Sequence, residues 1–212
     1  MPANPRPRPR PVRKPRNAYH HGDLRHALVE EAVRTIQAGG VAALTLRAVG
    51  QRLGVSRTAL YRHFADKSAL LAAVGREGFR VFRQELVAAV ESHAGRRGFQ
   101  EMGRAYVRFA VTHPSHYRVM FGGFLEACRN DPELVQEASA SFQVLVDSLS
   151  AQQKAGRLRA DHTEQMARYV WAIVHGIAML AIDGQLAGTD PDEEARYAIK
   201  RLATGIARRA SP

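Results

Sequence analysis

The sequence has little from which to build a secreted, membrane-spanning or disulfide-bonded protein. Cys128 is the only cysteine among 212 residues, so an internal disulfide is excluded and a reducing compartment is expected. The longest uncharged apolar stretch, residues 169–182, has 14 residues, fewer than the ~20 that cross a bilayer. Residues 1–16 lack the apolar segment of a signal peptide. These absences predict a cytoplasmic protein that does not enter a membrane.

Motifs for chemistry are missing as well. Nine histidines are present, including the groups His20, His21 and His26 and, further on, His113 and His116. No HExxH or CxxC pattern accompanies them, so we expect no metal site and no cofactor. No nucleophile, base and orienting group form a recognisable set, which argues against an enzyme.

Acidic residues are scarce in the first third of the chain. Residues 1–78 carry 14 Lys or Arg and five Asp or Glu, whereas residues 79–212 carry 17 and 15. The formal net charge of +11 is therefore concentrated near the N-terminus. Such asymmetry is typical of a chain whose basic part meets a polyanion, because neutralising phosphates releases counterions. Nucleic acid is the expected partner, and an anionic membrane surface is the alternative.

The extreme N-terminus is the most unusual segment. Residues 1–16 alternate Pro with Arg or Lys, which removes backbone donors and favours an extended, solvated chain. We predict a disordered basic arm over residues 1–18. It either reaches into a minor groove of DNA or remains a solvated tail.

The rest of the chain has the apolar spacing of helices, and no stretch of comparable length alternates as a strand does. Apolar residues recur at three- and four-residue spacing from Asp23 to Gly39-Gly40, which predicts a first helix with a glycine stop. Thr45, Ser56 and Asp66 are placed to cap three further helices. The last of these, from Asp66 to His93, would link two domains. We therefore predict an all-α fold.

Capping patterns also predict where the later helices begin. Asp131-Pro132 and Asp190-Pro191 combine an N-cap with a proline in the first turn, and Asp161 with Glu164 resembles a capping box. The apolar face of the last two helices is larger than one chain needs, so we predict a homodimer through residues 161–209. Burial within one chain is the alternative. The apolar residues of this face are Met166, Val170, Ile173, Val174, Ile177, Leu180, Ala181, Ile199, Leu202 and Ile206.

Residues 44–64 have the organisation of a helix-turn-helix. Two short helices flank Gly54, which permits a sharp turn. Apolar Val49 and Val55 would hold the helices together, while the second helix exposes polar side chains suited to the major groove of DNA. An ordinary helical hairpin with solvated charges is the alternative. The exposed positions of the second helix are Arg57, Thr58, Tyr61 and Arg62.

Residues 19–74, ending in Leu-Tyr-Arg-His-Phe-Ala-Asp-Lys at 60–67, resemble the tetracycline-repressor (TetR) family of regulators. The resemblance implies a three-helix DNA-binding domain over residues 19–66 and an effector-binding and dimerisation domain, a helical bundle, over residues 67–212. It also makes Tyr61, His63 and Lys67 phosphate contacts. The expected DNA contacts are Thr45, Arg47, Arg57, Thr58, Tyr61, His63 and Lys67.

Trp171 with His175-Gly176, and residues 113–123, are similar to one type of C-terminal domain in that family. The expectation is a repressor that binds a palindromic operator as a dimer and is released by an apolar small molecule. Activation and non-specific DNA compaction are the alternatives. The residues expected to line the effector pocket are Tyr106, Phe109, Tyr117, Phe121, Trp171 and His175.

Overall fold

The computed structural model describes residues 21–93, 95–128 and 131–206, and every regular element in these ranges is a helix. This confirms the predicted all-α class. The basic arm of residues 1–18 and His20 lie outside the described residues. Along the chain the elements are α1 (His21–Ala43), α2 (Leu46–Leu53), α3 (Arg57–His63), α4 (Lys67–Glu91), α5 (Arg96–Thr112), α6 (Pro114–Phe121), the 3-10 helix η1 (Phe124–Cys128), α7 (Pro132–Lys154), α8 (Thr163–Ile182) and α9 (Pro191–Ile206).

The predicted caps of the first helices are confirmed. The side chains of Thr45, Ser56 and Asp66 each accept a hydrogen bond from the backbone N–H three residues later, at 3.1, 3.2 and 2.8 Å. Gly54 adopts a left-handed conformation (φ 65°, ψ 25°) between α2 and α3, which an L side chain rarely adopts. Gly40, with φ 74°, interrupts α1. Local sequence therefore fixes where these helices begin and turn.

The predicted capping box at the start of α8 is wrong. The N-cap is His162, one residue later than expected, and its side chain makes no cap hydrogen bond. The Asp161 carboxylate instead accepts from the His162 N–H at 2.8 Å. Glu164 thus falls at the second helical position rather than the third, and its carboxylate faces Arg168.

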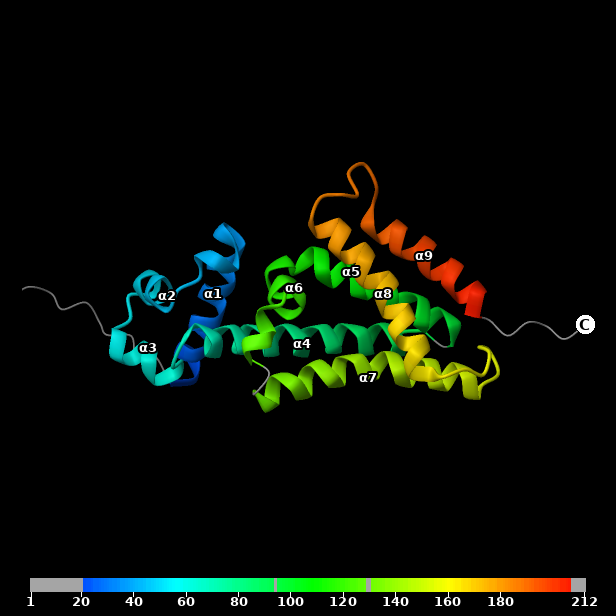
Figure 1. The fold of residues 1–212 in the computed structure, drawn as a ribbon, viewed down its shortest axis with the longest axis horizontal. Helices are drawn as coiled ribbons and strands as arrows, with labels where there is room; N and C mark the ends of the chain where they lie inside the picture. The colour runs from blue at the N-terminus through cyan, green and yellow to red at the C-terminus, as the bar shows by residue number, and fades with distance from the viewer. Residues whose placement is uncertain (1–20, 94, 129–130, 207–212) are drawn as a thin grey trace, which may run out of the picture.

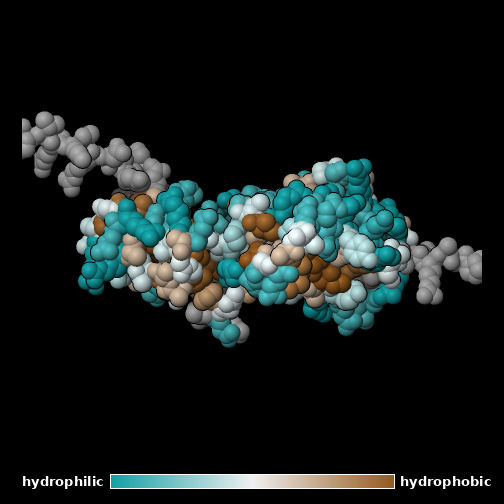
Figure 2. Space-filling view, turned by 90° about the horizontal axis from the view of Figure 1, so that it is seen from above, coloured by the Kyte–Doolittle hydropathy of each residue, from teal (hydrophilic) through white to brown (hydrophobic). Residues whose placement is uncertain are grey.

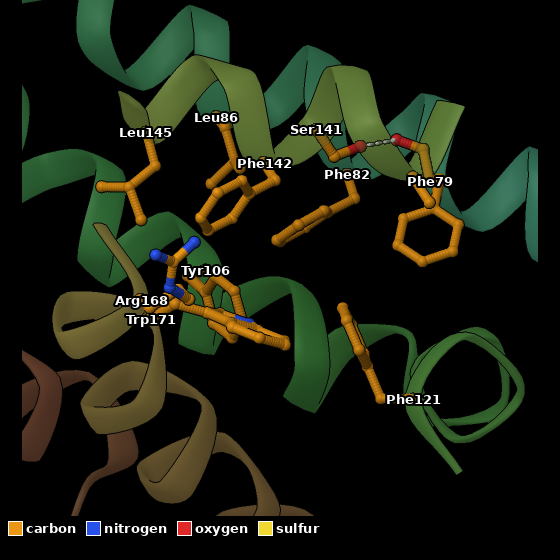
Figure 3. Close-up of a pocket in the computed structure, with 11 residues that line it drawn as sticks. Phe79, Phe82, Leu86, Tyr106, Phe121, Ser141, Phe142, Leu145, Arg168 and Trp171 are labelled. Atoms are coloured by element: carbon orange, nitrogen blue, oxygen red, sulfur yellow. Dashed lines mark hydrogen bonds between the residues drawn. The ribbon is translucent and has the colours of Figure 1, made fainter. Parts of the chain in front are cut away.

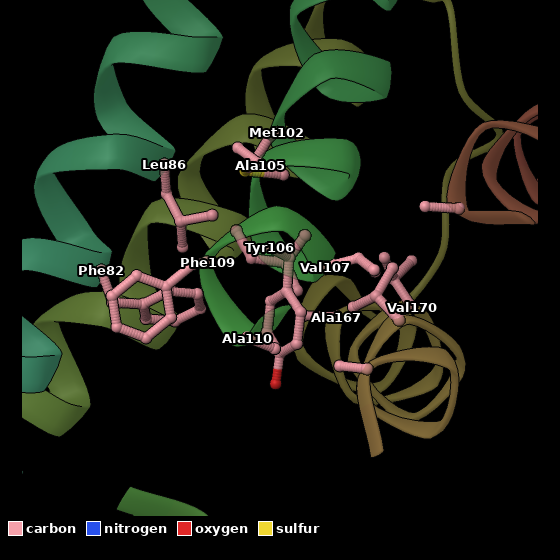
Figure 4. Packing of buried hydrophobic residues seen from close by; sticks show 14 of the residues in the cluster. Phe82, Leu86, Met102, Ala105, Tyr106, Val107, Phe109, Ala110, Ala167 and Val170 are labelled. Atoms are coloured by element: carbon pink, nitrogen blue, oxygen red, sulfur yellow. The ribbon is translucent and has the colours of Figure 1, made fainter. Parts of the chain in front are cut away.

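Two hydrophobic cores divide the molecule, and α4 contributes to both. Leu70, Leu71 and Val74 pack with α1, α2 and α3 in the N-terminal core, whereas Phe82 and Leu86 pack with the C-terminal helices. Figure 1 shows α4 running from the small N-terminal group of helices along most of the larger bundle, with α7 beside it. Figure 4 shows the second core, where side chains of α4, α5 and α8 meet. Helix α4 is thus a continuous connection between the two parts.

The short helix α6 also contributes to both cores. Val119 is completely buried among N-terminal residues, while Tyr117 and Met120 belong to the C-terminal core. Because consecutive α6 residues point to different sides, this single helix contacts both groups of helices.

The apolar surface of α8 and α9 is divided differently from the prediction. Met166, Val170 and Val174 of α8 are buried in the chain's own core, as are Ile199 and Leu202 of α9. Their assignment to an intermolecular face is therefore wrong, because periodicity shows that a face is apolar but not what covers it. The α8 residues outside this buried stripe include Tyr169, Ile173, Ile177 and Leu180.

Candidate nucleic-acid interface and apolar cavity

Helices α2 and α3 are held together by buried apolar side chains on their inner faces. Val49 of α2 and Leu60 of α3 are at most 3% exposed, and Phe64 closes the same core directly after α3. The outer side of α3 is thereby left to polar residues. Arg57, Thr58, Tyr61 and Arg62 are all exposed there, as the sequence predicts.

A polar cluster fixes α2 against α1. The nearly buried Glu31 accepts hydrogen bonds from Arg34 at 2.8 Å and Arg52 at 3.3 Å, and Arg52 also donates to Thr35 at 3.2 Å. The hydrogen bond from Arg34, helped by Arg52, lowers the pKa of Glu31. Arg52 therefore orients the first helix of the hairpin. Sequence reasoning missed this role, because the partners are 17 and 21 residues apart.

Three of the predicted DNA contacts share one surface. Arg47 of α2 and Arg57 and Tyr61 of α3 line a hollow of about 570 Å³ between the two helices, together with Gln51. The Arg57 guanidinium lies 5.6 Å from the centre of the Tyr61 ring, a cation–π distance. Thr58 is exposed on the same helix. Gln51 was not predicted, although its position four residues after Arg47 puts it on the same side of α2.

The remaining three predicted contacts lie at helix ends. The Thr45 hydroxyl is used as the cap of α2. The half-buried Lys67 donates from Nζ to the Val41 carbonyl at 2.9 Å and so ties the start of α4 to the end of α1. His63 is half-buried near the end of α3. In this structure Lys67 therefore has an internal partner.

A second feature is an apolar cavity of about 310 Å³ between α4, α5, α7 and α8 (Figure 3). This volume is at the lower end of the usual size of ligand pockets, roughly 300–1,000 Å³. Six aromatic rings contribute to its wall, and Arg168 stands at one end. The lining residues are Phe79, Phe82, Leu86, Tyr106, Phe121, Ala138, Ser141, Phe142, Leu145, Arg168 and Trp171.

The structure brings all six predicted pocket residues together, but they do not have equal roles. Tyr106, Phe121 and Trp171 line the cavity. Phe109 and Tyr117 are at most 1% exposed and pack behind the wall, so we describe them as support for it.

His175 also stands behind the wall, in a network of buried polar groups. Tyr106 Oη accepts a hydrogen bond from Trp171 Nε1 at 3.0 Å and bonds the Tyr117 hydroxyl at 3.0 Å. His175 Nδ1 lies 2.7 Å from the Tyr117 hydroxyl and 3.1 Å from that of Tyr106. Burial raises the pKa of both tyrosines and lowers the pKa of His175. The network is therefore uncharged at neutral pH.

Sequence reasoning missed the part of the wall that α4 and α7 provide. Phe79, Phe82 and Leu86 lie three and four residues apart on α4, which is the helical spacing of one face. Ala138 and Phe142 follow the same rule on α7. The spacing was visible in the sequence, but it does not separate a residue that lines a cavity from one that fills a core.

Together these features define a helix-turn-helix DNA-binding regulator with a helical C-terminal domain. The chain belongs to the tetR family of bacterial regulatory proteins: the model of that family's N-terminal domain matches residues 28–74, and the model of a tetracyclin repressor-like C-terminal domain matches residues 99–202. The predicted family is confirmed.

Individual relatives agree with this assignment. An uncharacterised HTH-type transcriptional regulator of Mycobacterium tuberculosis is 26% identical over 88% of this chain and 83% of its own. An HTH-type transcriptional repressor of the same organism is 29% identical over 78% of this chain and 86% of its own. The solved structure of a protein with unknown function from Rhodococcus sp. RHA1 is 34% identical, with a TM-score of 0.82, and the match covers 91% of this chain and all of that one.

Proposed function

We propose that this regulator is a repressor that binds a pseudo-palindromic operator as a homodimer and is released by a small-molecule effector. The observation that carries the proposal is the connection of two sites by α4. Its first turns pack in the core beneath α2 and α3, and Phe79, Phe82 and Leu86 of the same helix line the apolar cavity. The name of the 29% identical mycobacterial relative, a transcriptional repressor, favours repression.

The proposed DNA contacts divide into two kinds. Arg47, Arg57 and Thr58 would meet base edges or nearby phosphates, since arginine bonds guanine acceptors and threonine contacts the thymine methyl group. Tyr61, His63 and Lys67 would bind phosphates, and Thr45 would lie beside the flanking backbone. Exposure of Arg57, Thr58 and Tyr61 on one short helix supports insertion of α3 into a major groove.

A partly exposed apolar face of α8 supports the dimer. Tyr169 is 57% exposed and Leu180 is 42% exposed, and Ile173 and Ile177 lie between them on the same side of α8. By length and composition, α8 is the one helix of the described ranges that could cross a membrane. Because its other side packs in the core and Arg168 lies within it, a second copy is the more fitting cover. Figure 2 shows apolar surface on one side of the larger part of the molecule, bordered by hydrophilic residues.

Effector release requires that a ligand favours one conformation over another. A ligand among Phe79, Phe82 and Phe121 would press on α4 and α6 together. Since Val119 of α6 is inserted in the N-terminal core, movement of either helix would change the angle of the DNA-reading helices. The two α3 helices of a dimer would then no longer match the operator spacing.

The test is binding to DNA from upstream of the protein's own gene, with random competitor DNA and a salt series. We expect specific binding that Tyr61→Ala and Arg57→Gln each weaken by about 1–3 kcal/mol. Tyr61→Phe removes the hydroxyl but keeps the ring that packs against Arg57, so it separates the contributions of these two groups to DNA binding. Arg96→Gln, an equal charge change on the exposed start of α5, is the matched control.

Equal affinity for random DNA would contradict the operator proposal and favour an architectural, DNA-compacting role, which the basic N-terminal third also suits. Equal weakening by Arg57→Gln and Arg96→Gln would mean that only general charge matters.

A further inference from the structure

The polar groups in the cavity wall are almost all engaged with one another. The Ser141 hydroxyl lies 2.8 Å from the Glu137 carbonyl and 3.1 Å from the Phe79 carbonyl, and Figure 3 shows the second contact. The Trp171 N–H is donated to the Tyr106 hydroxyl, which has two further partners. A hydroxyl has one proton to give. A ligand would therefore have to break a buried hydrogen bond to gain a donor from any of these three residues.

Arg168 is the exception among the described residues that line the cavity. Its guanidinium has five N–H donors. Among the described residues, the guanidinium donates a hydrogen bond to the exposed Glu164 carboxylate at 3.4 Å. That distance is long for a charge-assisted hydrogen bond, which is usually about 2.7–2.9 Å. Exposed pairs of this kind contribute little stability. Arg168 can thus exchange Glu164 for a ligand at low cost.

The position of Arg168 relative to the rings defines the shape of the ligand. In Figure 3 its guanidinium lies near Leu145, Tyr106 and Trp171, whereas Phe79 and Phe121 are at the opposite side of the cavity. One end of the cavity is therefore cationic and open to solvent, since the Arg168 side chain is 56% exposed. The other end is apolar and aromatic.

From this arrangement we propose that the effector is an apolar monocarboxylate, whose carboxylate binds Arg168 at the cavity mouth and whose hydrocarbon body lies among the rings of α4, α6 and α7. The proposal rests on the proposed function, because it identifies the ligand class of the same cavity. A planar guanidinium binds a carboxylate through two parallel hydrogen bonds, which an ester cannot reproduce. The small cavity volume of about 310 Å³ excludes large conjugates from full enclosure.

The test compares two carboxylates with their uncharged methyl esters: biphenyl-4-carboxylate for an aromatic body and decanoate for an alkyl body. Binding is followed by calorimetry and by the emission of Trp171, the only tryptophan in the chain. For at least one body we expect the carboxylate to bind about ten- to hundred-fold more tightly than the ester, as hydrogen bonds to charged groups allow. Arg168→Gln should abolish this preference and leave ester affinity within about two-fold.

Two variants control for other effects. Arg196→Gln removes an equally exposed arginine with a glutamate partner on α9, and it should keep the preference. Glu164→Gln removes the competing carboxylate and should maintain or raise carboxylate affinity. The proposal is overturned if ester and carboxylate bind equally, if neither body binds, or if the preference survives in Arg168→Gln.

Operator binding of the same samples without ligand separates this proposal from the previous one. Specific DNA binding with no Arg168-dependent carboxylate preference would overturn the ligand class and retain the repressor. An Arg168-dependent preference in a protein without specific DNA binding would do the reverse.

Discussion

At Gly103 the packing of α5 against α9 has no room for a side chain. A Cβ atom added at this residue would lie 1.6 Å from Ile199 Cδ1, far inside van der Waals contact. Ile199 is 1% exposed and Val174 is also close, so neither the methyl group nor Ile199 could move aside freely. The absence of one carbon atom thus sets how closely two helices approach.

We expect Gly103→Ala to lower the free energy of unfolding by about 1–3 kcal/mol, the usual cost of overpacking a core. Urea unfolding followed by circular dichroism measures the change. Gly50→Ala is the control, because its added Cβ would meet side chains at 3.6 Å or more. Equal stability of Gly103→Ala and wild type would show that Ile199 adopts another rotamer without strain.

Between elements, α5 and α9 are also joined by an ion pair. Arg104 of α5 donates to the Asp192 carboxylate in the first turn of α9 and to Glu101 at 2.9 Å, while Arg108 lies 3.6 Å from Asp192. The hydrogen bond from Arg104 is the main reason that the pKa of Asp192 is lowered. A carboxylate in the first turn also interacts favourably with the positive N-terminal end of the helix dipole.

A carboxyl group whose pKa is lower in the folded than in the unfolded protein stabilises the fold at any pH above the ordinary pKa of Asp, about 3.9. This stabilisation is lost as the pH falls through the pKa of the folded state. We expect Asp192→Asn to lower the free energy of unfolding by about 1 kcal/mol at pH 7, since the pair is partly exposed, and by much less at pH 3. Urea unfolding at both pH values tests this. Glu193→Gln, which breaks an exposed pair with Arg196, should change little at either pH.

For the whole molecule, the apolar side of α8 makes a prediction about assembly. Leu180→Glu puts a charge in the proposed dimer interface, where burying it without a partner is costly. We expect the variant to sediment as a monomer at concentrations where wild type is a dimer, and to lose at least ten-fold in operator affinity.

The control is Val135→Glu, because Val135 is 48% exposed on α7 and lies outside the proposed interface. If both variants remain dimers, α8 is not the interface. If wild type is a monomer on the operator, the proposed two-fold symmetry is wrong.

The sequence by itself determined the features that depend on near neighbours. Caps at Thr45, Ser56, Asp66 and Asp131 bond backbone groups three residues away, and Gly54 needs only its own φ. The helix-turn-helix could therefore be predicted, together with the exposed side of α3. The start of α8 was misplaced by one residue because the Asp161 carboxylate accepts the N–H of His162, the N-cap residue, and not an N–H within the helix.

Only the tertiary structure decided which apolar faces enclose space and which fill it. Phe79 and Phe82 of α4 line a cavity to which Ala138 and Ser141 of α7 also contribute, whereas Tyr117 of α6 is completely buried. Met166 and Leu180 share one helix, yet one is in the core and the other is exposed. Helical periodicity is a property of a single segment, but burial depends on residues from several segments, so it is settled only when the helices pack.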